Sequence, residues 1–323
     1  MASSEQVFDL QFIDHTAFYG VGDSHLNQIR SFFPKLKIIA RGDMVKVIGT
    51  KTDIEVFAER FQNLLKHFDI FGDLKTNDIA QIMGGEDISS GESLAQMPAD
   101  VIVYGRSGQP IKARTRNQQK MVEKLQTSDM MFAVGPAGTG KTYTAVALAV
   151  KYLKEKKVRR IVLTRPAVEA GENLGFLPGD LREKLDPYLQ PLYDALNDML
   201  PQQKLLGYFD DGTIEIAPLA FMRGRTLEKS FVILDEAQNA TRMQMKMFLT
   251  RMGQDSKFVI TGDMTQIDLP RTQASGLIHA VNMVKNIPEI SIIKLDQSDV
   301  IRHPIVTKII NAYENELDNE NNK

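Results

Sequence analysis

Eight residues near the middle of the chain restrict its fold more than any other segment. Residues 135–142 read Gly-Pro-Ala-Gly-Thr-Gly-Lys-Thr, which matches the pattern G-x-x-x-x-G-K-[ST]. An apolar run at 130–134 precedes them and a helical pattern at 142–153 follows, so we expect a strand, a glycine-rich loop and a helix. This order is typical of a phosphate-binding loop, because backbone N–H groups and the helix N-terminus then point at phosphate oxygens.

The side chains that end this loop indicate the ligand. Lys141 is expected to contact the β- and γ-phosphates of ATP, and Thr142 to offer its hydroxyl to Mg²⁺. The predicted phosphate-binding residues are Gly135, Pro136, Ala137, Gly138, Thr139, Gly140, Lys141 and Thr142. A dinucleotide-binding fold would instead need G-x-G-x-x-G, so hydride transfer is disfavoured.

Composition excludes several other kinds of site. The chain has no cysteine, which rules out disulfides, thiolate metal sites and a cysteine nucleophile and fits a reducing compartment. Its five histidines form no H-E-x-x-H pair, and no G-x-S-x-G sequence is present. The net charge of -2 provides no global basic field, so any nucleic-acid contact must be a local patch. With no signal peptide and no run of about 18 apolar residues, we predict a cytoplasmic protein without a membrane partner.

Apolar runs that alternate with helical patterns predict the architecture. Beyond residue 120 the strand-like runs are 130–134, 161–164, 214–217, 231–234, 258–261 and 290–295, which is typical of a parallel α/β sheet flanked by helices. Nearer the N-terminus, residues 7–68 read as β-α-β-β-α, a small α+β unit. We therefore predict an α+β domain at 1–85, a linker and hairpin at 86–115, a P-loop ATPase domain at 116–315 and a disordered acidic tail at 316–323.

Two adjacent carboxylates, Asp235 and Glu236, end the apolar run 231–234. Ligands bind at the carboxyl ends of strands in such sheets. Asp235 is expected to hold Mg²⁺ through water, and Glu236 to orient and deprotonate an attacking water. The pair therefore predicts hydrolysis of ATP.

A third polar segment, Gly-Asp-Met-Thr-Gln at 262–266, follows the apolar run 258–261. It falls at the same edge of the predicted sheet. Gln266 is a candidate sensor of the γ-phosphate, and Asp263 a candidate link between that sensor and a bound polymer.

Four segments together resemble the PhoH family, a bacterial branch of ATPases similar to superfamily 1 helicases. They are GPAGTGKT, LTRPAVEAGENLGFLPGD, FVILDEAQN and TGDMTQIDLP, and the resemblance covers roughly residues 100–315. It implies a RecA-like P-loop domain. The N-terminal unit resembles the KH-like start of these proteins, but no G-x-x-G sequence joins two of its predicted helices.

The resemblance also implies roles for single residues. Gln118 matches the glutamine that reads adenine, and Arg165 and Arg182 belong to a segment that contacts a nucleic-acid strand. Arg302 matches an arginine finger, which stabilises charge on the transferring phosphoryl group. Because too few residues follow the P-loop for a second helicase lobe, Arg302 is most simply expected to act on a neighbouring subunit's ATP, in a ring that the resemblance makes a hexamer.

The sequence thus predicts an RNA-linked, ring-forming ATPase that acts on single-stranded RNA, with an endoribonuclease as a partner suggested by the family. Two alternatives stay open. A P-loop kinase would need a lid and an acceptor pocket for a small molecule, and a nucleotide-gated scaffold would use ATP to assemble partners.

Overall fold

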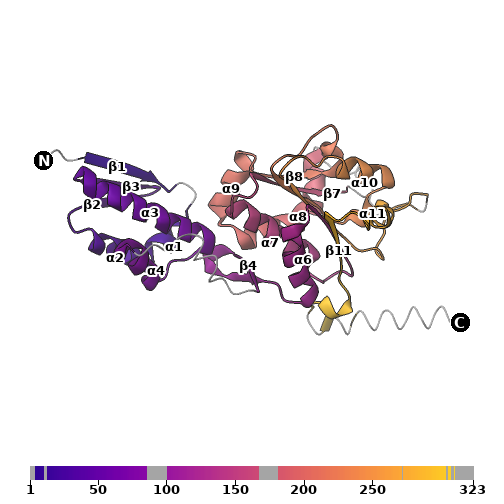
Figure 1. The fold of residues 1–323 in the computed structure, drawn as a ribbon, viewed down its shortest axis with the longest axis horizontal. Helices are drawn as coiled ribbons and strands as arrows, with labels where there is room; N and C mark the ends of the chain where they lie inside the picture. The colour runs from indigo at the N-terminus through magenta and orange to yellow at the C-terminus, as the bar shows by residue number, and fades with distance from the viewer. Residues whose placement is uncertain are drawn as a thin grey trace.

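The computed structural model of the chain consists of two packed units that lie side by side along its long axis (Figure 1). It describes residues 4–10, 13–85, 100–166, 181–270, 272–302, 305–306 and 309, with only the backbone described at 107 and 181–187. Within these ranges, no helix has both the length and the hydrophobicity that crossing a membrane requires. The predicted tail at 316–323 and residues 86–99 of the predicted linker lie outside the described part.

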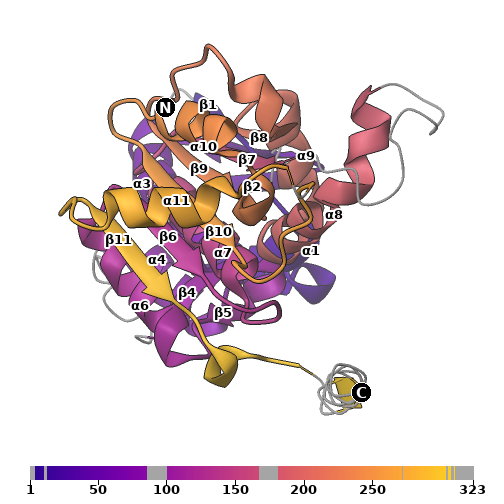
Figure 2. The ribbon, with the colours of Figure 1, turned by 90° about the vertical axis from the view of Figure 1, so that its right-hand side faces the viewer.

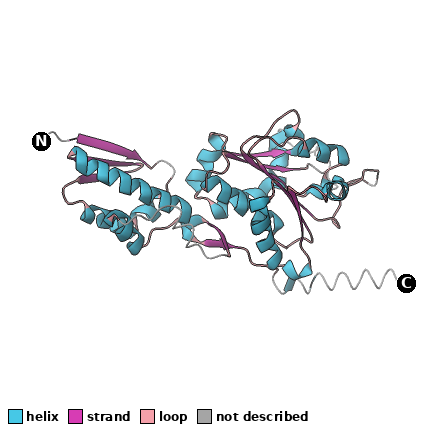
Figure 3. Cartoon of the chain, viewed as in Figure 1, coloured by secondary structure: helices cyan, strands magenta, loops and turns pink. Residues whose placement is uncertain are grey.

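The smaller, N-terminal unit is a three-stranded antiparallel sheet packed against helices (Figure 3). The strand order is β1-β3-β2, so the last strand in sequence lies in the middle. The elements are β1 (Ser4–Asp9), α1 (His15–Tyr19), α2 (Ser24–Phe32), β2 (Lys37–Arg41), β3 (Met44–Gly49), α3 (Lys51–Phe71) and α4 (Thr76–Gly84).

The observed order β-α-α-β-β-α corrects the predicted β-α-β-β-α. The missed helix, α1, has five residues, too few to display an apolar period of its own. It begins at Asp14, whose carboxylate accepts hydrogen bonds from the backbone N–H groups of Thr16 and Ala17 at 3.0 and 3.2 Å. A loop at 20–23, Gly-Val-Gly-Asp, therefore joins two helices, and the side chain of Val21 at its tip is 90% exposed. The sequence did not predict a connection between two helices here. The connecting sequence is not G-x-x-G.

Aromatic rings form the centre of the N-terminal core. Phe8 from β1 and Phe18 from α1 pack against Phe57 and Phe61 of α3, with ring centroids 5.0 to 5.8 Å apart. Phe57 and Phe61 are four residues apart, so they share one face of the helix. Removing one such buried ring costs about 3–5 kcal/mol, so this unit has a core of its own.

The larger unit contains a six-stranded sheet in which every pairing is parallel, in the order β11-β6-β10-β9-β7-β8 (Figure 2). All six predicted strands are present, and the predicted α/β fold is confirmed. The strands are β6 (Met130–Val134), β7 (Arg160–Arg165), β8 (Ile214–Pro218), β9 (Ser230–Leu234), β10 (Lys257–Gly262) and β11 (Ile290–Lys294). The helices are α6 (Arg116–Thr127), α7 (Lys141–Lys154), α8 (Leu181–Met199), α9 (Gln202–Asp210), α10 (Arg242–Leu249) and α11 (Gly276–Val284).

Helices cover both faces of this sheet. Along β6, Met131 and Ala133 belong to the core under α6 to α9, whereas Met130, Phe132 and Val134 belong to the core under α10 and α11. The strand is buried on both sides, which is why its sequence is continuously apolar rather than alternating. The predicted hairpin is also present, as β4 (Val101–Tyr104) paired with β5 (Pro110–Lys112), and it lies between the two units in Figure 1.

Parallel pairing brings the carboxyl ends of the central strands to one edge. Gly262 of β10 lies beside Val134 of β6, and Leu234 of β9 lies beside Thr164 of β7. The loops that follow these strands therefore start next to one another. They carry the P-loop and the polar residues singled out from the sequence.

Candidate nucleotide site

The P-loop, residues 135–142, leaves β6 and runs directly into α7, as predicted. Gly138 and Gly140 have φ values of 82° and 71°, in the left-handed region that residues with a Cβ rarely adopt. A Cβ at Gly138 would lie 2.5 Å from Nε of Arg302, and one at Gly140 would lie 2.8 Å from Nε2 of Gln118. The left-handed backbone favours glycine at both positions, and the side chains of Arg302 and Gln118 pack closely against the loop.

Lys141 is folded back into the loop. Its ammonium donates hydrogen bonds to the carbonyl oxygens of Gly135 and Pro136, both at 2.7 Å, and the residue is 8% exposed. Burial lowers the pKa of this lysine, and the nearby carboxylates of Asp263, Glu236 and Asp235 oppose that shift. A phosphate oxygen would compete with the two carbonyls for the same ammonium.

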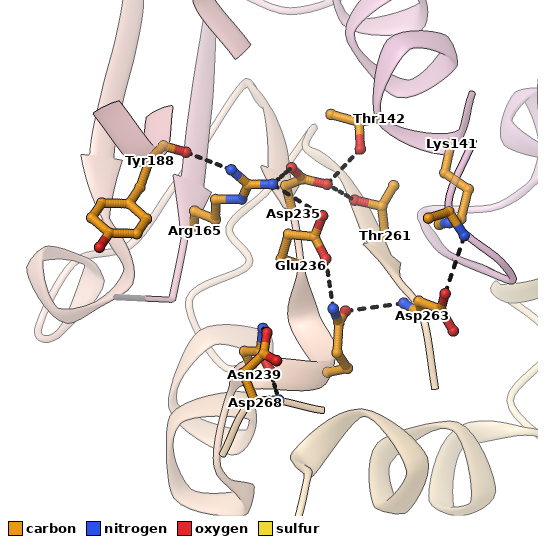
Figure 4. A network of polar contacts seen from close by, with 12 residues as sticks. Lys141, Thr142, Arg165, Tyr188, Asp235, Glu236, Asn239, Thr261, Asp263 and Asp268 are labelled. Atoms are coloured by element: carbon orange, nitrogen blue, oxygen red, sulfur yellow. Dashed lines mark hydrogen bonds and ion pairs between the residues drawn. The ribbon is translucent and has the colours of Figure 1, made fainter. Parts of the chain in front are cut away.

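Asp235 is buried and accepts hydrogen bonds from two hydroxyl groups (Figure 4). Its Oδ1 accepts hydrogen bonds from the hydroxyls of Thr142 at 2.6 Å and Thr261 at 2.7 Å. The residue is 2% exposed, and its Oδ2 is buried without a hydrogen bond, 3.3 Å from Nη2 of Arg165. The two residues predicted to share Mg²⁺, Thr142 and Asp235, are therefore in direct contact.

Glu236 points in a different direction from Asp235. Its backbone φ is 49°, in the left-handed region, which turns the chain sharply after β9. Its side chain is 39% exposed, and its two oxygens accept hydrogen bonds from Arg165 at 3.0 Å and from Gln238 at 2.5 Å. The carboxylate thus faces the open side of the site and is held by two donors.

Gln238 lies within the segment FVILDEAQN and is a further functional candidate, for which the sequence alone indicated no role. While its Nε2 donates to Glu236, its Oε1 accepts from the backbone N–H of Asp263 at 3.0 Å. Asp263 in turn accepts from the backbone N–H of Ala137, in the P-loop, at 3.1 Å. A continuous chain of contacts therefore joins the P-loop to Glu236, through Asp263 and Gln238 (Figure 4).

Asp263 is buried and contacts the P-loop, whereas Gln266, the predicted γ-phosphate sensor, is exposed. Asp263 is 4% exposed, and besides Ala137 it accepts hydrogen bonds from the backbone and hydroxyl of Thr265. Gln266 is exposed, and its backbone N–H donates a hydrogen bond to the Asp263 carbonyl at 3.3 Å. The role of Gln266 as a γ-phosphate sensor stays a prediction, whereas Asp263 already contacts the P-loop.

Gln118 lies at the P-loop, as a residue that reads adenine would. It is 3% exposed, and its side-chain amide accepts from the N–H of Arg114 at 2.7 Å and donates to the carbonyl of Thr139 at 2.9 Å. Both ends of the amide are occupied by backbone groups. Reading adenine, which stays a prediction, would require one of them to be released.

Arg302 contacts the P-loop of its own chain. Its Nη2 donates to the carbonyl of Ala137 at 2.6 Å, and the preceding N–H, of Ile301, donates to the carbonyl of Gly138 at 2.9 Å. The action of Arg302 on a neighbouring subunit's ATP stays a prediction. Chain length alone could not reveal that the segment after β11 returns to the loop.

Arg165, which the family resemblance assigns to strand binding, lies against the acidic pair in this structure. Its guanidinium is 17% exposed, pairs with Asp235 and Glu236, and donates to the Tyr188 carbonyl at 2.5 Å. It therefore lies within the candidate nucleotide site, and its contact with a nucleic-acid strand stays a prediction. The side chain of Arg182 and residues 167–180 of the same predicted segment lie outside the described part of the chain.

A glycine-rich loop between a parallel strand and a helix, facing an acidic pair at the end of a second strand, defines a P-loop NTPase. Comparison with known sequences identifies the group within that class. The family model described as PhoH-like protein matches residues 110–314. The chain belongs to the PhoH family, as its motifs suggested.

The relatives extend beyond the P-loop unit. The chain is 47% identical over 298 residues to a PhoH-like protein of Bacillus subtilis, covering 92% of this chain and 93% of that protein. It is 42% identical over 298 residues to a PhoH-like protein of Synechocystis, covering 92% and 90%. Among solved structures it is similar to a Pif1 helicase from Candida albicans with a TM-score of 0.31 and 14% identity, covering 58% of this chain and 40% of that one. That structural similarity is too low to support an argument about function.

Proposed function

We propose that this chain hydrolyses ATP with Mg²⁺ and couples hydrolysis to single-stranded RNA. The observation that supports hydrolysis is the arrangement of Thr142, Asp235 and Glu236 at one edge of the sheet. The hydroxyl of Thr142 lies 2.6 Å from the buried carboxylate of Asp235, while the neighbouring Glu236 faces outward. We therefore assign metal binding to the buried Asp235 and water activation to the adjacent, partly exposed Glu236.

The oxygen atoms present fit a magnesium ion. The Thr142 hydroxyl and the Asp235 carboxylate are the hard oxygen groups that Mg²⁺ prefers, and Oδ2 of Asp235 is buried without a hydrogen bond. In the described ranges, no group of three or more His, Cys, Asp and Glu side chains could hold a metal by itself. Phosphate oxygens and water would complete the shell, and the ion would supply charge neutralisation at the phosphates.

Glu236 is the candidate general base. It lies beside the metal-binding carboxylate, is partly open to solvent, and is oriented by Arg165 and Gln238. A carboxylate held by two donors is restricted in its rotamers, so it can orient a water for attack at the terminal phosphate. Arg165 offsets negative charge where two carboxylates and a triphosphate would otherwise repel one another.

Two cations from the same chain would neutralise the transferred group. Lys141 already lies inside the loop, and Arg302 reaches its outer side. We propose that Arg302 acts on the ATP bound by its own chain. A ring of six subunits remains part of the proposal on the family resemblance, without support from Arg302.

The link to RNA, the endoribonuclease partner and the cytoplasmic location are likewise proposed from the resemblance to the PhoH family. The test measures ATP turnover with single-stranded RNA, single-stranded DNA and small phosphate acceptors. Stimulation by RNA supports the proposal, whereas phosphate transfer to a small acceptor would indicate a kinase. Turnover that no polymer changes would contradict the RNA link, and light scattering with and without ATP tests the ring.

A further inference from the structure

The two units meet around a cavity at the far end of the P-loop helix. Its volume is about 680 Å³, within the range of about 300–1,000 Å³ that small-molecule sites have. Helix α3 of the N-terminal unit lines one side, and α6, the last turns of α7 and the turn after α7 line the other. Helix α7 rises about 1.5 Å per residue, so the cavity lies about 20 Å from the P-loop.

The lining of this cavity is strongly basic. Two carboxylates contribute to it, Asp69 and Glu155. Against them stand five lysines, which are Lys66, Lys151, Lys154, Lys156 and Lys157. The lining therefore has an excess of positive charge, although the whole chain carries a net charge of -2.

The carboxylates do not neutralise all of these lysines. Glu155 pairs with Lys157 at 2.7 Å and, more distantly, with Lys151 at 3.9 Å. Asp69 is paired with Lys204, which does not line this cavity. Within the described part of the chain, Lys66 and Lys156 make no ion pair.

The end of a helix explains only some of this charge. Lys151 and Lys154 lie in the last turn of α7, where cations interact favourably with the exposed carbonyl groups. Lys66 comes from α3, in the other unit, and gains nothing from that helix end. The helix dipole of α7 therefore does not explain why Lys66 lines the same cavity.

Lys154 is the most constrained member of the set. Its ammonium donates to the carbonyl of Tyr104 at 2.8 Å, which ties α7 to the hairpin between the units. Burial lowers the pKa of this lysine to about 8, even though Asp69 favours the charged form. A buried cation without a full counter-charge is costly, and an anion in the cavity would remove that cost.

We propose that this cavity binds a small, multiply charged phosphate compound, either a nucleotide or an inorganic polyphosphate. Such a ligand would contact Lys66 and Lys154 together and so tie α3 to the end of the P-loop helix. A strand of RNA is disfavoured, because the lysines line one cavity of limited volume. The proposal does not depend on ATP hydrolysis.

The test uses the full chain with Lys141→Ala, which weakens phosphate binding at the P-loop, in buffer without Mg²⁺. Calorimetry with inorganic tripolyphosphate should detect one binding site. Adding Lys66→Gln and Lys156→Gln, two exposed lysines, should weaken the affinity about tenfold or more. The matched control is Lys246→Gln with Lys285→Gln, which neutralises two exposed lysines at α10 and α11, on the other face of the six-stranded sheet. It should change the affinity for tripolyphosphate less than about threefold. ATP that binds more tightly than tripolyphosphate would identify the nucleotide as the source of the phosphates.

Hydrogen exchange checks the location independently of the substitutions. Tripolyphosphate should protect the backbone around residues 62–70 and 151–158. Three results would overturn the proposal: no binding of tripolyphosphate, equal loss in the two double variants, or protection confined to the P-loop. Binding of a single-stranded RNA that tripolyphosphate does not displace, but that the cavity substitutions abolish, would contradict it as well.

Discussion

The hydroxyl of Thr142 donates a 2.6 Å hydrogen bond to Asp235, although 93 residues separate the two in sequence. Thr142 lies in the first turn of α7, and Asp235 follows the last residue of β9. Both positions fall at the carboxyl edge of the parallel sheet, so the fold itself assembles the pair. Oδ1 of Asp235 also accepts from Thr261, which fixes the rotamer of the carboxylate.

This pair makes the metal dependence testable. Asp235→Asn keeps an acceptor for the two threonines but removes the charge, so turnover should fall about a hundredfold and more Mg²⁺ should be needed for half-maximal rate. The measurement is phosphate release against Mg²⁺ concentration. Asp255→Asn, at an exposed turn before β10, is the control and should match the unsubstituted chain. An unchanged magnesium dependence in Asp235→Asn would contradict the assignment.

Gln238 should act by positioning Glu236. Because it contacts Glu236 and the backbone of Asp263 but no P-loop residue, Gln238→Ala should lower kcat about ten- to a hundredfold while KM for ATP changes less than about threefold. Gln238→Asn should not restore the rate, since the shorter amide cannot span both partners. Steady-state kinetics would check both variants, with the exposed Gln254→Ala as control. A change in KM alone would argue for a role in binding.

Mixed subunits distinguish whether Arg302 acts within its chain or between chains. In this structure Arg302 contacts Ala137 of its own P-loop, so Lys141→Ala and Arg302→Ala should both inactivate the same site. Mixing the two inactive variants should therefore give no activity. Recovery of a substantial fraction of the activity would place the finger in a neighbouring subunit instead.

Stability should depend on pH through Lys154. The folded-state pKa is about 8, below the ordinary 10.5, so the folded chain carries this charge at a cost below pH 8. As pH rises from 8 to 10.5, the folded state releases the proton before the unfolded state does, and stability rises. Relative to Lys154→Met, the free energy of unfolding should increase by at most about 3 kcal/mol over that window. Urea denaturation at several pH values measures it, and a flat difference would refute the shift.

Some features of this protein are encoded locally and could be predicted. The sequence 130–142 specifies a strand, a loop and a helix without help from the rest of the chain, because β6 is apolar throughout and the loop needs its glycines. The position of Asp235 and Glu236 at the edge of the sheet could be predicted for the same reason, since they directly follow a buried strand.

Other features depend on contacts between distant segments. Arg165 and Glu236 are 71 residues apart, and only the pairing of β7 with β9 turns the arginine into part of the site. Arg302 and Ala137 are 165 residues apart. The hydrophobic pattern of the sequence does not predict that the chain returns to the P-loop after β11. Helix α1 escaped prediction because five residues held by one capping aspartate give no repeating pattern.

The central claim is that Glu236 activates water against the terminal phosphate of a Mg²⁺-bound ATP. The most direct test compares phosphate release by the purified chain and by Glu236→Gln, with ATP binding measured in parallel. We predict magnesium-dependent release by the unsubstituted chain and a loss of about a hundredfold or more in Glu236→Gln, with ATP still bound. Equal rates in the two proteins, or no magnesium-dependent release by the unsubstituted chain, would contradict the account.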